Sequence, residues 1–362
     1  MADELASRLS TGDDLGASIV VELDGQVVVD LWGGWRDEQH RCTWEHDSLV
    51  NVWSITKIAT AVAVLHLADT GNIDLHAPVG RYWPEFTVNG KENITVAQVL
   101  SHTSGVAGWE RPFTLDALYT WDEASTRLAA QTPWWEPGTA SGYHAQNYGQ
   151  LLGEVVRRTS GSPLRDYLAK HITGPLGADF EIGLNPRNHS RAAFLVPPQR
   201  THPTFPPGFD SQLFQKTFTA PPIDAAVAMT TSWRAAELGA MNGHGNARSA
   251  VRIASMLHPD ARQHVRLSQE AISAAFIPVS DCTDRVLGLP LRWGLGIAIA
   301  DERTFPYLPA GVGVWGGWGG SLVVIDRKRH LTVAYVMNKM APDIIGSPRA
   351  QAYLQAVYAS LA

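Results

Sequence analysis

Cysteine is scarce in this chain, with only two among its 362 residues. Cys42 and Cys282 are far apart, and two such thiols in a long chain are more often free than paired. Free thiols are typical of a reducing compartment. Because no basic segment followed by an apolar stretch is visible at the N-terminus, we also expect no signal peptide and a cytoplasmic protein.

The chain has no excess of positive charge and no long apolar runs. The 29 Lys and Arg residues are outnumbered by 35 Asp and Glu residues, which gives a formal net charge of -6 and no basic footprint for nucleic acid. The apolar runs are too short to span a bilayer. No His-Glu-x-x-His motif, cysteine pair or phosphate-binding glycine loop is found, so we expect neither a metal nor a cofactor.

What the chain does contain is ordinary for a globular protein of this size. Hydrophobic residues make up 45% and charged residues 18% of the sequence, and the length suggests about two domains with a large core. The 13 tryptophans are many for this length, and some could line an apolar pocket. Composition leaves the oligomeric state open.

Strand patterns gather at the two ends of the chain. Residues 17–23 and 26–31 flank Asp24-Gly25, a strong hairpin signal. Residues 321–325 and 331–336 flank a charged turn and predict a second hairpin, and residues 293–299 predict one further strand. Hairpins at both ends favour one antiparallel sheet assembled from both termini.

Helical patterns fill the middle. Helices are expected from Ser54 to about Asp69 and over residues 94–100, 146–159, 163–170, 248–257 and 348–360. The many prolines of the stretch 185–222 predict a loop there. We therefore predict an α/β (α+β) fold, with an antiparallel sheet flanked by helices and a mostly helical insertion. The expected sheet part is 1–75 and 240–362, and the helical part is 76–239; together they would form one catalytic domain.

Ser54-Ile55-Thr56-Lys57 is the candidate nucleophile motif. Serine needs a base to take its proton, and residues three apart share one helix face, so the Lys57 amine can reach the Ser54 hydroxyl. The positive first turn of the helix favours an oxyanion near Ser54 and disfavours a charged Lys57. The alternative is an N-capping serine beside a solvated lysine.

Two further motifs strengthen the catalytic reading. Tyr143, in Gly-Tyr-His-Ala, precedes an expected helix and can project its phenol into a cleft. A neighbouring lysine could lower the pKa of Tyr143 enough for general base catalysis, although a half-buried core tyrosine is the common case. Trp315-Gly316-Gly317-Trp318 enters an expected strand, where glycines permit close approach of a ligand. An edge strand there would offer a free N–H for an oxyanion hole shared with the N–H of Ser54.

The order of these motifs resembles that of the penicillin-recognising serine hydrolases, whose signature includes Ser-x-x-Lys. The likeness covers nearly the whole chain and is closest to the class C β-lactamase-like branch, within it to family VIII carboxylesterases. Those esterases similarly carry Tyr-His-Ala and Trp-Gly-Gly, which stand here at 143–145 and 315–317. Further segments that carry the resemblance are 69–75, 84–86, 100–105, 137–139, 148–156 and 242–249.

The resemblance implies a role for each motif. Ser54 would be the nucleophile, Lys57 its base and Tyr143 the proton shuttle, and the N–H groups of Ser54 and Trp318 would hold the oxyanion. Trp315, Gly316 and Gly317 would contact the substrate, a small-molecule ester. An acyl-Ser54 ester would form and then be released to water.

Two departures from the lactamase pattern bear on the substrate. Ala145 stands where lactamases have Asn, so it cannot bond a substrate amide, and Trp315 stands where they have a cation. Both changes favour neutral, apolar acyl groups, and the neighbouring Gln146 could replace the missing amide. Alternatives that remain are an acyltransferase acting on an alcohol of a larger metabolite, a β-lactamase or D-amino-acid peptidase, and a non-catalytic scaffold. His102 and Ser104 are expected to be structural, and the side chain of His144 is expected to point the other way from that of Tyr143.

Overall fold

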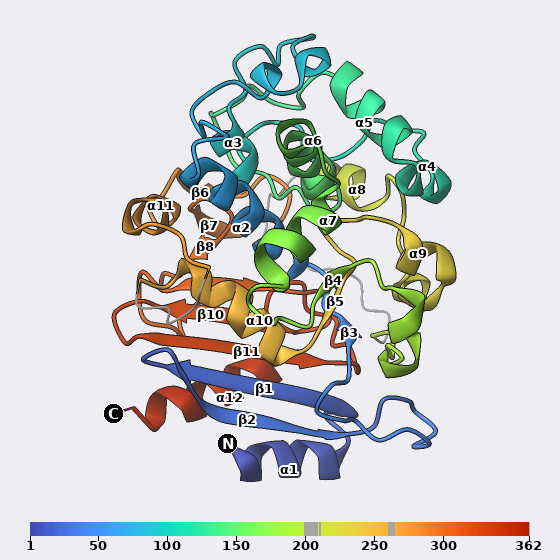
Figure 1. Cartoon of the computed structure of the whole chain (residues 1–362), viewed down its shortest axis with the longest axis vertical. Coiled ribbons are helices and arrows are strands. Elements are labelled where there is room, and N and C mark those ends of the chain that lie inside the picture. Colours follow the sequence, from blue (N-terminus) through green and yellow to red (C-terminus); the bar gives the residue numbers. More distant parts are fainter. Residues whose placement is uncertain (199–208, 210, 260–264, 362) are drawn as a thin grey trace.

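An eight-stranded antiparallel sheet forms the base of the molecule (Figure 1). The computed structural model describes residues 1–198, 209, 211–259 and 265–361. The strand order is β2-β1-β11-β10-β9-β8-β7-β6. The strands are β1 (Gly16–Leu23), β2 (Gln26–Gly34), β6 (Ser280–Thr283), β7 (Pro290–Trp293), β8 (Ala298–Ile299), β9 (Gly313–Gly316), β10 (Leu322–Asp326) and β11 (Leu331–Met337).

Both predicted hairpins are confirmed. Asp24 and Gly25 have φ values of 52° and 71°, the left-handed pair that a tight hairpin turn requires, and they join β1 to β2. β10 and β11 pair from Leu322↔Tyr335 to Asp326↔Leu331. β1 then pairs with β11 along its length, so the first and last strands of the chain lie side by side, second and third from the β2 edge of the sheet. The predicted sheet built from both termini is therefore correct.

Helices cover the sheet and build the part of the molecule above it in Figure 1. They are α1 (Ala2–Thr11), α2 (Thr56–Asp69), α3 (Val96–Leu100), α4 (Leu115–Tyr119), α5 (Trp121–Ala130), α6 (Tyr148–Ser160), α7 (Leu164–Leu168), α8 (Gln212–Phe218), α9 (Thr231–Ala235), α10 (Ala247–Ala254), α11 (Gln269–Ala275) and α12 (Pro348–Ala359). Short 3-10 or π turns occur at Val79–Arg81, Pro84–Phe86, Ala169–Thr173, Pro186–Arg191, Ala225–Met229 and Ser255–Leu257.

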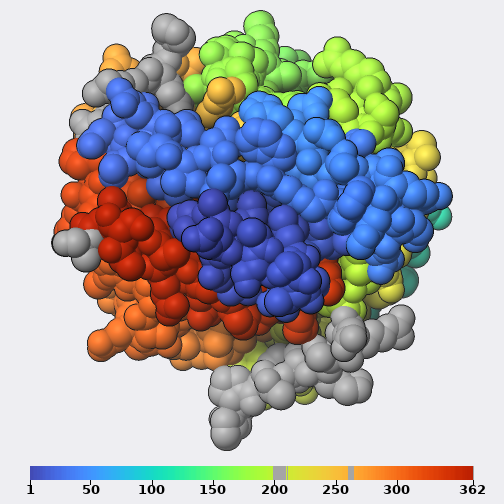
Figure 2. Space-filling model, turned by 90° about the horizontal axis from the view of Figure 1, so that it is seen from below, coloured from blue at the N-terminus to red at the C-terminus, as the bar shows by residue number. Residues whose placement is uncertain are grey.

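The two ends of the chain meet on the outer face of the sheet. Figure 2 shows the first residues, in dark blue, beside the last residues, in red. Arg349 of α12 donates to the Asp13 carbonyl and to the Asp14 carboxylate, which is itself buried. The phenols of Tyr335 and Tyr353 also donate to Asp14, so one buried carboxylate ties β11 and α12 to the N-terminal segment.

Helix α2 runs through the middle of the molecule, between the sheet and the helical part. Its side chains are buried on almost every side, which explains why its sequence is apolar all round rather than amphipathic. It packs against α6 and α7 of the helical part and against α10, which lies on the sheet. A small sheet of order β3-β5-β4, made of Val50–Asn51, Gly243–Gly245 and Glu181–Ile182, closes the start of α2.

The structure corrects three details of the predicted elements. Residues 293–299 are two strands rather than one, because Gly294 and Gly296 form a turn in which Gly296 has φ 83°. The stretch 185–222 contains helix α8, although 199–208 and 210 lie outside the described residues. The predicted helix at Ser54 begins two residues later, at Thr56. The proposed subdomain boundaries near 75 and 240 stay a prediction.

In the described part of the chain, no helix is both long and apolar enough to cross a membrane.

Candidate active site

Ser54 lies half-buried in the turn that joins β3 to α2. The preceding residue, Trp53, has φ 49°, in the left-handed region that non-glycine residues rarely adopt. The Thr56 hydroxyl holds this turn, since it donates to the Trp53 carbonyl at 2.5 Å and accepts the Gly243 N–H at 2.8 Å. A strained turn fixed in this way is a common setting for a reactive residue.

Lys57 occupies the first turn of α2 and is 2% exposed. Its Nζ lies 3.1 Å from Ser54 Oγ and also donates to the carbonyls of Ala145 at 2.7 Å and Ala240 at 2.9 Å. No carboxylate pairs with it among the described residues. Burial therefore lowers the pKa of Lys57 well below its ordinary value of 10.5, which favours the neutral amine that a base requires.

Tyr143 joins Ser54 and Lys57 from the segment that precedes α6. It is 1% exposed, and Lys57 Nζ lies 4.7 Å from the centre of its ring. The phenol is hydrogen-bonded with Ser54 and accepts the Trp315 Nε1–H at 3.3 Å. These contacts bring together all three residues that the motifs singled out.

The expected direction of the Tyr143 pKa is wrong. Burial raises the pKa of Tyr143 above its ordinary value of 10.0, and this effect outweighs the lowering by its hydrogen bonds with Ser54 and Trp315. The reason is that the dry surroundings disfavour the charge of a tyrosinate, and the nearby Asp284 disfavours it further. The resting site therefore contains a neutral phenol and an amine whose proton is easily lost.

Trp315, Gly316 and Gly317 lie at the end of β9 beside the turn that carries Ser54. β9 is an internal strand rather than the expected edge strand, since it pairs with β10 and, through Gly313 and Val314, with β8. The pairing with β8 stops at Val314. Trp315 and Gly316, the last residues of β9, therefore have no partner strand on that side. Trp315 is buried against the Tyr143 ring, at 5.0 Å between ring centres.

Gly317 allows the chain after β9 to lie close to the turn that carries Ser54. A Cβ at this position would come closer than 3.0 Å to both the Val52 carbonyl oxygen and the Ser321 hydroxyl. In the described structure the N–H groups of Ser54 and Trp318 donate to no protein acceptor. An oxyanion hole needs two such free N–H groups beside the nucleophile, and Ser54 and Trp318 both line the same cavity.

A cavity of about 290 Å³ opens at Ser54 and Tyr143. Its other lining residues are mostly apolar, and none of those described is Asp, Glu, Lys or Arg: Trp53, Ala145, Gln146, Phe214, Phe218, Ile223, Met241, Trp318, Pro342 and Ile344. Trp318 lines the cavity, whereas Trp315 lies behind Tyr143, and the substrate-binding role of both residues stays a prediction. Phe214 and Phe218 come from α8, in the stretch that was expected to be a loop.

Three polar residues beside Tyr143 form a buried network. Ser104 Oγ lies 2.6 Å from His144 Nε2, and His144 Nδ1 lies 2.7 Å from the Gly142 carbonyl. His102 Nδ1 accepts the His144 N–H at 3.1 Å, and burial lowers the pKa of both imidazoles. All three residues are nearly inaccessible to solvent. The structural role expected for His102 and Ser104 stays a prediction.

Sequence reasoning missed Asp284, which no motif marks. Its buried carboxylate accepts the Tyr143 N–H at 3.0 Å from a distant part of the chain. A lone Asp before a hydrophobic strand gives no local signal of such a contact. Among the described residues, no cluster of three His, Cys, Asp or Glu side chains is placed to hold a metal ion.

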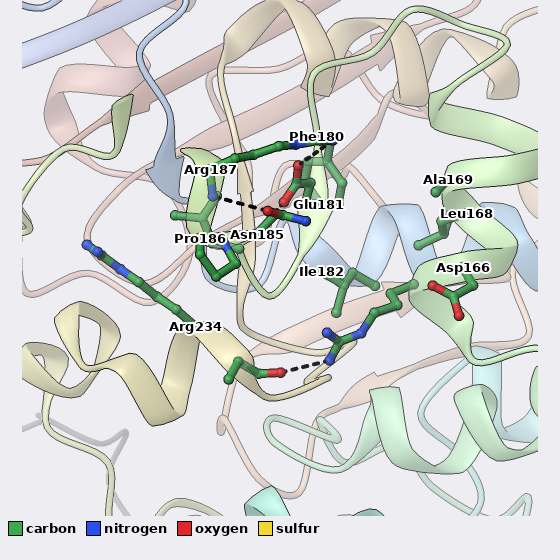
Figure 3. A pocket seen from close by; sticks show the side chains of 13 residues that line it. Asp166, Leu168, Ala169, Phe180, Glu181, Ile182, Asn185, Pro186, Arg187 and Arg234 are labelled. Atoms are coloured by element: carbon green, nitrogen blue, oxygen red, sulfur yellow. Dashed lines mark hydrogen bonds and ion pairs between the residues drawn. The ribbon is translucent and has the colours of Figure 1, made fainter. Parts of the chain in front are cut away.

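A second cavity, of about 410 Å³, lies between α7, β4 and α9 (Figure 3). Two of its arginines pair with protein groups. Arg165 pairs with Glu237 at 3.1 Å and donates to the Ala235 carbonyl, and Arg187 lies 4.0 Å from Glu181. Figure 3 shows Arg234 extending away from these groups. None of the described lining side chains is Ser, Thr or Cys, so this cavity offers no hydroxyl or thiol nucleophile.

Comparison with known proteins supports the family that the order of the motifs resembles. Residues 3–358 match the Beta-lactamase family model. The solved structure titled as a family VIII carboxylesterase superposes with a TM-score of 0.91 at 35% identity, covering 99% of this chain and 96% of that one. The esterase/beta-lactamase LipL of Mycobacterium tuberculosis is 31% identical over 91% of this chain and 78% of its own length. Esterase EstB of Burkholderia gladioli is 28% identical over 99% of this chain and 96% of its own.

Proposed function

The chain belongs to the β-lactamase family, and from this premise we propose that it is a serine hydrolase that cleaves carboxylic esters through an acyl-Ser54 intermediate. The observation that carries the proposal is the buried Lys57 amine, which has no acidic partner among the described residues and lies 3.1 Å from Ser54 Oγ. A neutral amine at this distance can take the hydroxyl proton as serine attacks.

Each neighbouring group has a place in this reaction. Ser54 Oγ bonds to the acyl carbon while its proton passes to Lys57 Nζ, and the N–H groups of Ser54 and Trp318 stabilise the oxyanion. Tyr143 donates its phenolic proton to the departing alkoxide and is reprotonated from Lys57. Water then attacks the acyl carbon of the Ser54 ester and passes a proton to the same groups. The bond from the acyl carbon to Ser54 Oγ breaks, Oγ takes up that proton, and the free acid leaves.

The cavity supports a neutral, apolar acyl group. Phe214, Phe218 and Ile223 form an apolar wall, and no charged side chain lines the described part of the cavity. A charged acyl group would lose its hydration there without gaining a counter-ion, whereas an alkyl chain gains from leaving water. We therefore propose esters of simple carboxylic acids as substrates.

β-Lactam hydrolysis is a second candidate, because the name of a relative that is 31% identical joins both activities. The site disfavours it here, since Ala145 lines the cavity without an amide group and Trp315, behind Tyr143, brings no positive charge for a β-lactam. We expect slower turnover of nitrocefin than of p-nitrophenyl butyrate. Adding alcohols to the ester assay would reveal acyl transfer as an ester product in place of free acid.

Ser54→Ala tests the nucleophile. It removes the only atom that can form the acyl bond, so we expect p-nitrophenyl butyrate turnover to fall to background and a phosphonate adduct to be absent by mass spectrometry. Ser104→Ala, which removes a buried serine hydroxyl near Tyr143, is the matched control and should still form the adduct. Ester turnover that survives Ser54→Ala would refute the proposal.

A further inference from the structure

The segment that carries Tyr143 is held by bonds from a distant turn. Asp284 and Arg285 lie between β6 and β7, and they reach this segment through two contacts. Asp284 Oδ1 accepts the Tyr143 N–H at 3.0 Å, and the Arg285 N–H donates to the Ser141 carbonyl at 2.8 Å. The position of the phenol relative to Ser54 therefore depends on a turn that is remote in sequence.

Asp284 also holds the ring on which the phenol packs. Its Oδ2 accepts the Trp293 Nε1–H at 3.2 Å. The Trp293 ring is nearly parallel to the Tyr143 ring, with 6.0 Å between ring centres, and lies 4.7 Å from Trp315, whose own N–H donates to the phenol. One carboxylate thus fixes both the backbone of Tyr143 and the aromatic stack around it.

Burial raises the pKa of Asp284, whereas its hydrogen-bond partners all favour the ionised carboxylate. Oδ1 accepts the N–H groups of Tyr143, Val286 and Leu287, each at 3.0 Å, and Oδ2 accepts the indole N–H. All four partners are donors, and only the charged form accepts on both oxygens without presenting an O–H of its own. The side chain is 0% exposed, so the N–H groups replace water as its solvation.

We propose that Asp284 is a positioning residue for the reaction at Ser54: its buried carboxylate orients the Tyr143 phenol by holding the Tyr143 backbone and the Trp293 ring together. Its negative charge also disfavours loss of the phenolic proton, so Tyr143 stays a proton donor for the leaving alkoxide. The inference rests on the proposed esterase function. It assigns a role to a residue outside the three motifs.

Asp284→Asn isolates this role. An amide keeps one oxygen but replaces the other with a donor NH2, so it satisfies either the three backbone N–H groups or the Trp293 indole, not both. We expect kcat for p-nitrophenyl butyrate to fall by up to about 100-fold, since misplacement of a catalytic group by about 1 Å has an effect of that size. KM should change little, because Asp284 does not line the cavity.

Asp326→Asn is the matched control. Asp326 is 1% exposed and likewise accepts N–H groups of its own turn, those of Lys328 and Arg329. Its other oxygen pairs with the Arg329 guanidinium and accepts the Tyr358 phenol. It ends β10 at the opposite end from the residue that pairs with Gly316. Replacing a buried carboxylate should lower the melting temperature of both variants. The kcat of Asp326→Asn should nevertheless stay near that of the wild type.

A double-mutant cycle separates positioning from general damage. In a Tyr143→Phe background the phenol is already gone, so adding Asp284→Asn should lower the residual kcat by less than about twofold. A full additional loss in that background would overturn the inference, as would a wild-type kcat for Asp284→Asn alone. Because Ser54→Ala tests the proposed function separately, failure of one idea is distinguishable from failure of the other.

If Asp284→Asn does not fold, Trp293→Phe tests the second contact. It keeps an aromatic ring beside Tyr143 but removes the indole N–H that Asp284 accepts. We expect a smaller loss of kcat that again disappears in the Tyr143→Phe background. An unchanged kcat in Trp293→Phe would contradict the inference.

Discussion

Gly317→Ala is the sharpest test of how the end of β9 approaches Ser54. The added Cβ would lie closer than 3.0 Å to the Val52 carbonyl oxygen and to the Ser321 hydroxyl, and 3.3 Å from Trp53 Cβ. The hydroxyl can rotate away. The Val52 carbonyl cannot move alone, because it accepts the Ile55 N–H at 3.3 Å within the turn that contains Ser54.

The magnitude follows from this coupling. Overpacking of this kind costs about 1–3 kcal/mol of folding free energy. With an unfolding entropy of about 2.1 cal/mol/K per residue, each kcal/mol of lost stability lowers the melting temperature of a chain of this length by about 1.3 °C. We therefore expect the melting temperature to fall by about 1–4 °C. Displacement of Ser54 from the N–H groups and from Lys57 should lower kcat by up to about 100-fold.

The assay is p-nitrophenyl butyrate turnover together with thermal unfolding of the same samples. Gly33→Ala is the control, because its Cβ would meet only the flexible end of Leu9, at 3.0 Å, on the outer part of the sheet. It should keep the wild-type kcat. If Gly317→Ala retains wild-type kcat, or loses stability without losing kcat, the reasoning that Gly317 sets the geometry at Ser54 is wrong.

Two further predictions concern the base and the cavity. Because burial lowers the pKa of Lys57, kcat/KM should rise with pH as Lys57 loses its proton and reach a plateau well below pH 10.5; a plateau reached only near 10.5 would contradict this. Lys57→Arg, which cannot lose its proton, should be inactive at every pH tested. Phe218→Ala enlarges the acyl cavity and should raise the octanoate-to-butyrate ratio of kcat/KM by about tenfold, measured with p-nitrophenyl esters. Phe194→Ala, which removes a side chain that is 51% exposed and does not line the cavity, should leave that ratio unchanged.

Local patterns in the sequence determined much of the architecture. The turn at Asp24-Gly25 and the alternation around it predicted a hairpin that the structure contains, because hairpin pairing depends on adjacent residues. The spacing of Ser54 and Lys57 predicted their contact for the same reason, since residues three apart meet across one turn. Their catalytic roles stay a prediction for the experiments above.

Only the tertiary structure decided the chemical state of the site. The position of Lys57 in the first turn of the helix predicted that its pKa would be lowered. The burial that lowers this pKa arises only in the tertiary structure, where Lys57 Nζ meets the carbonyls of Ala145 and Ala240 from segments far away in the sequence. The same holds for Tyr143, whose pKa is raised by burial although the neighbouring lysine suggested the opposite. Desolvation depends on everything packed around a group.

The remaining differences share one physical cause. No pattern in the sequence indicated that Asp284 would reach Tyr143, or that α8 would carry Phe214 and Phe218 to the cavity. Nor did it show that β9 would lie inside the sheet rather than at its edge. The sequence by itself determined which residues could do chemistry and which segments would pair with near neighbours. Long-range packing decided which groups are dry, which are held and which face the substrate, because those properties arise only when distant segments meet.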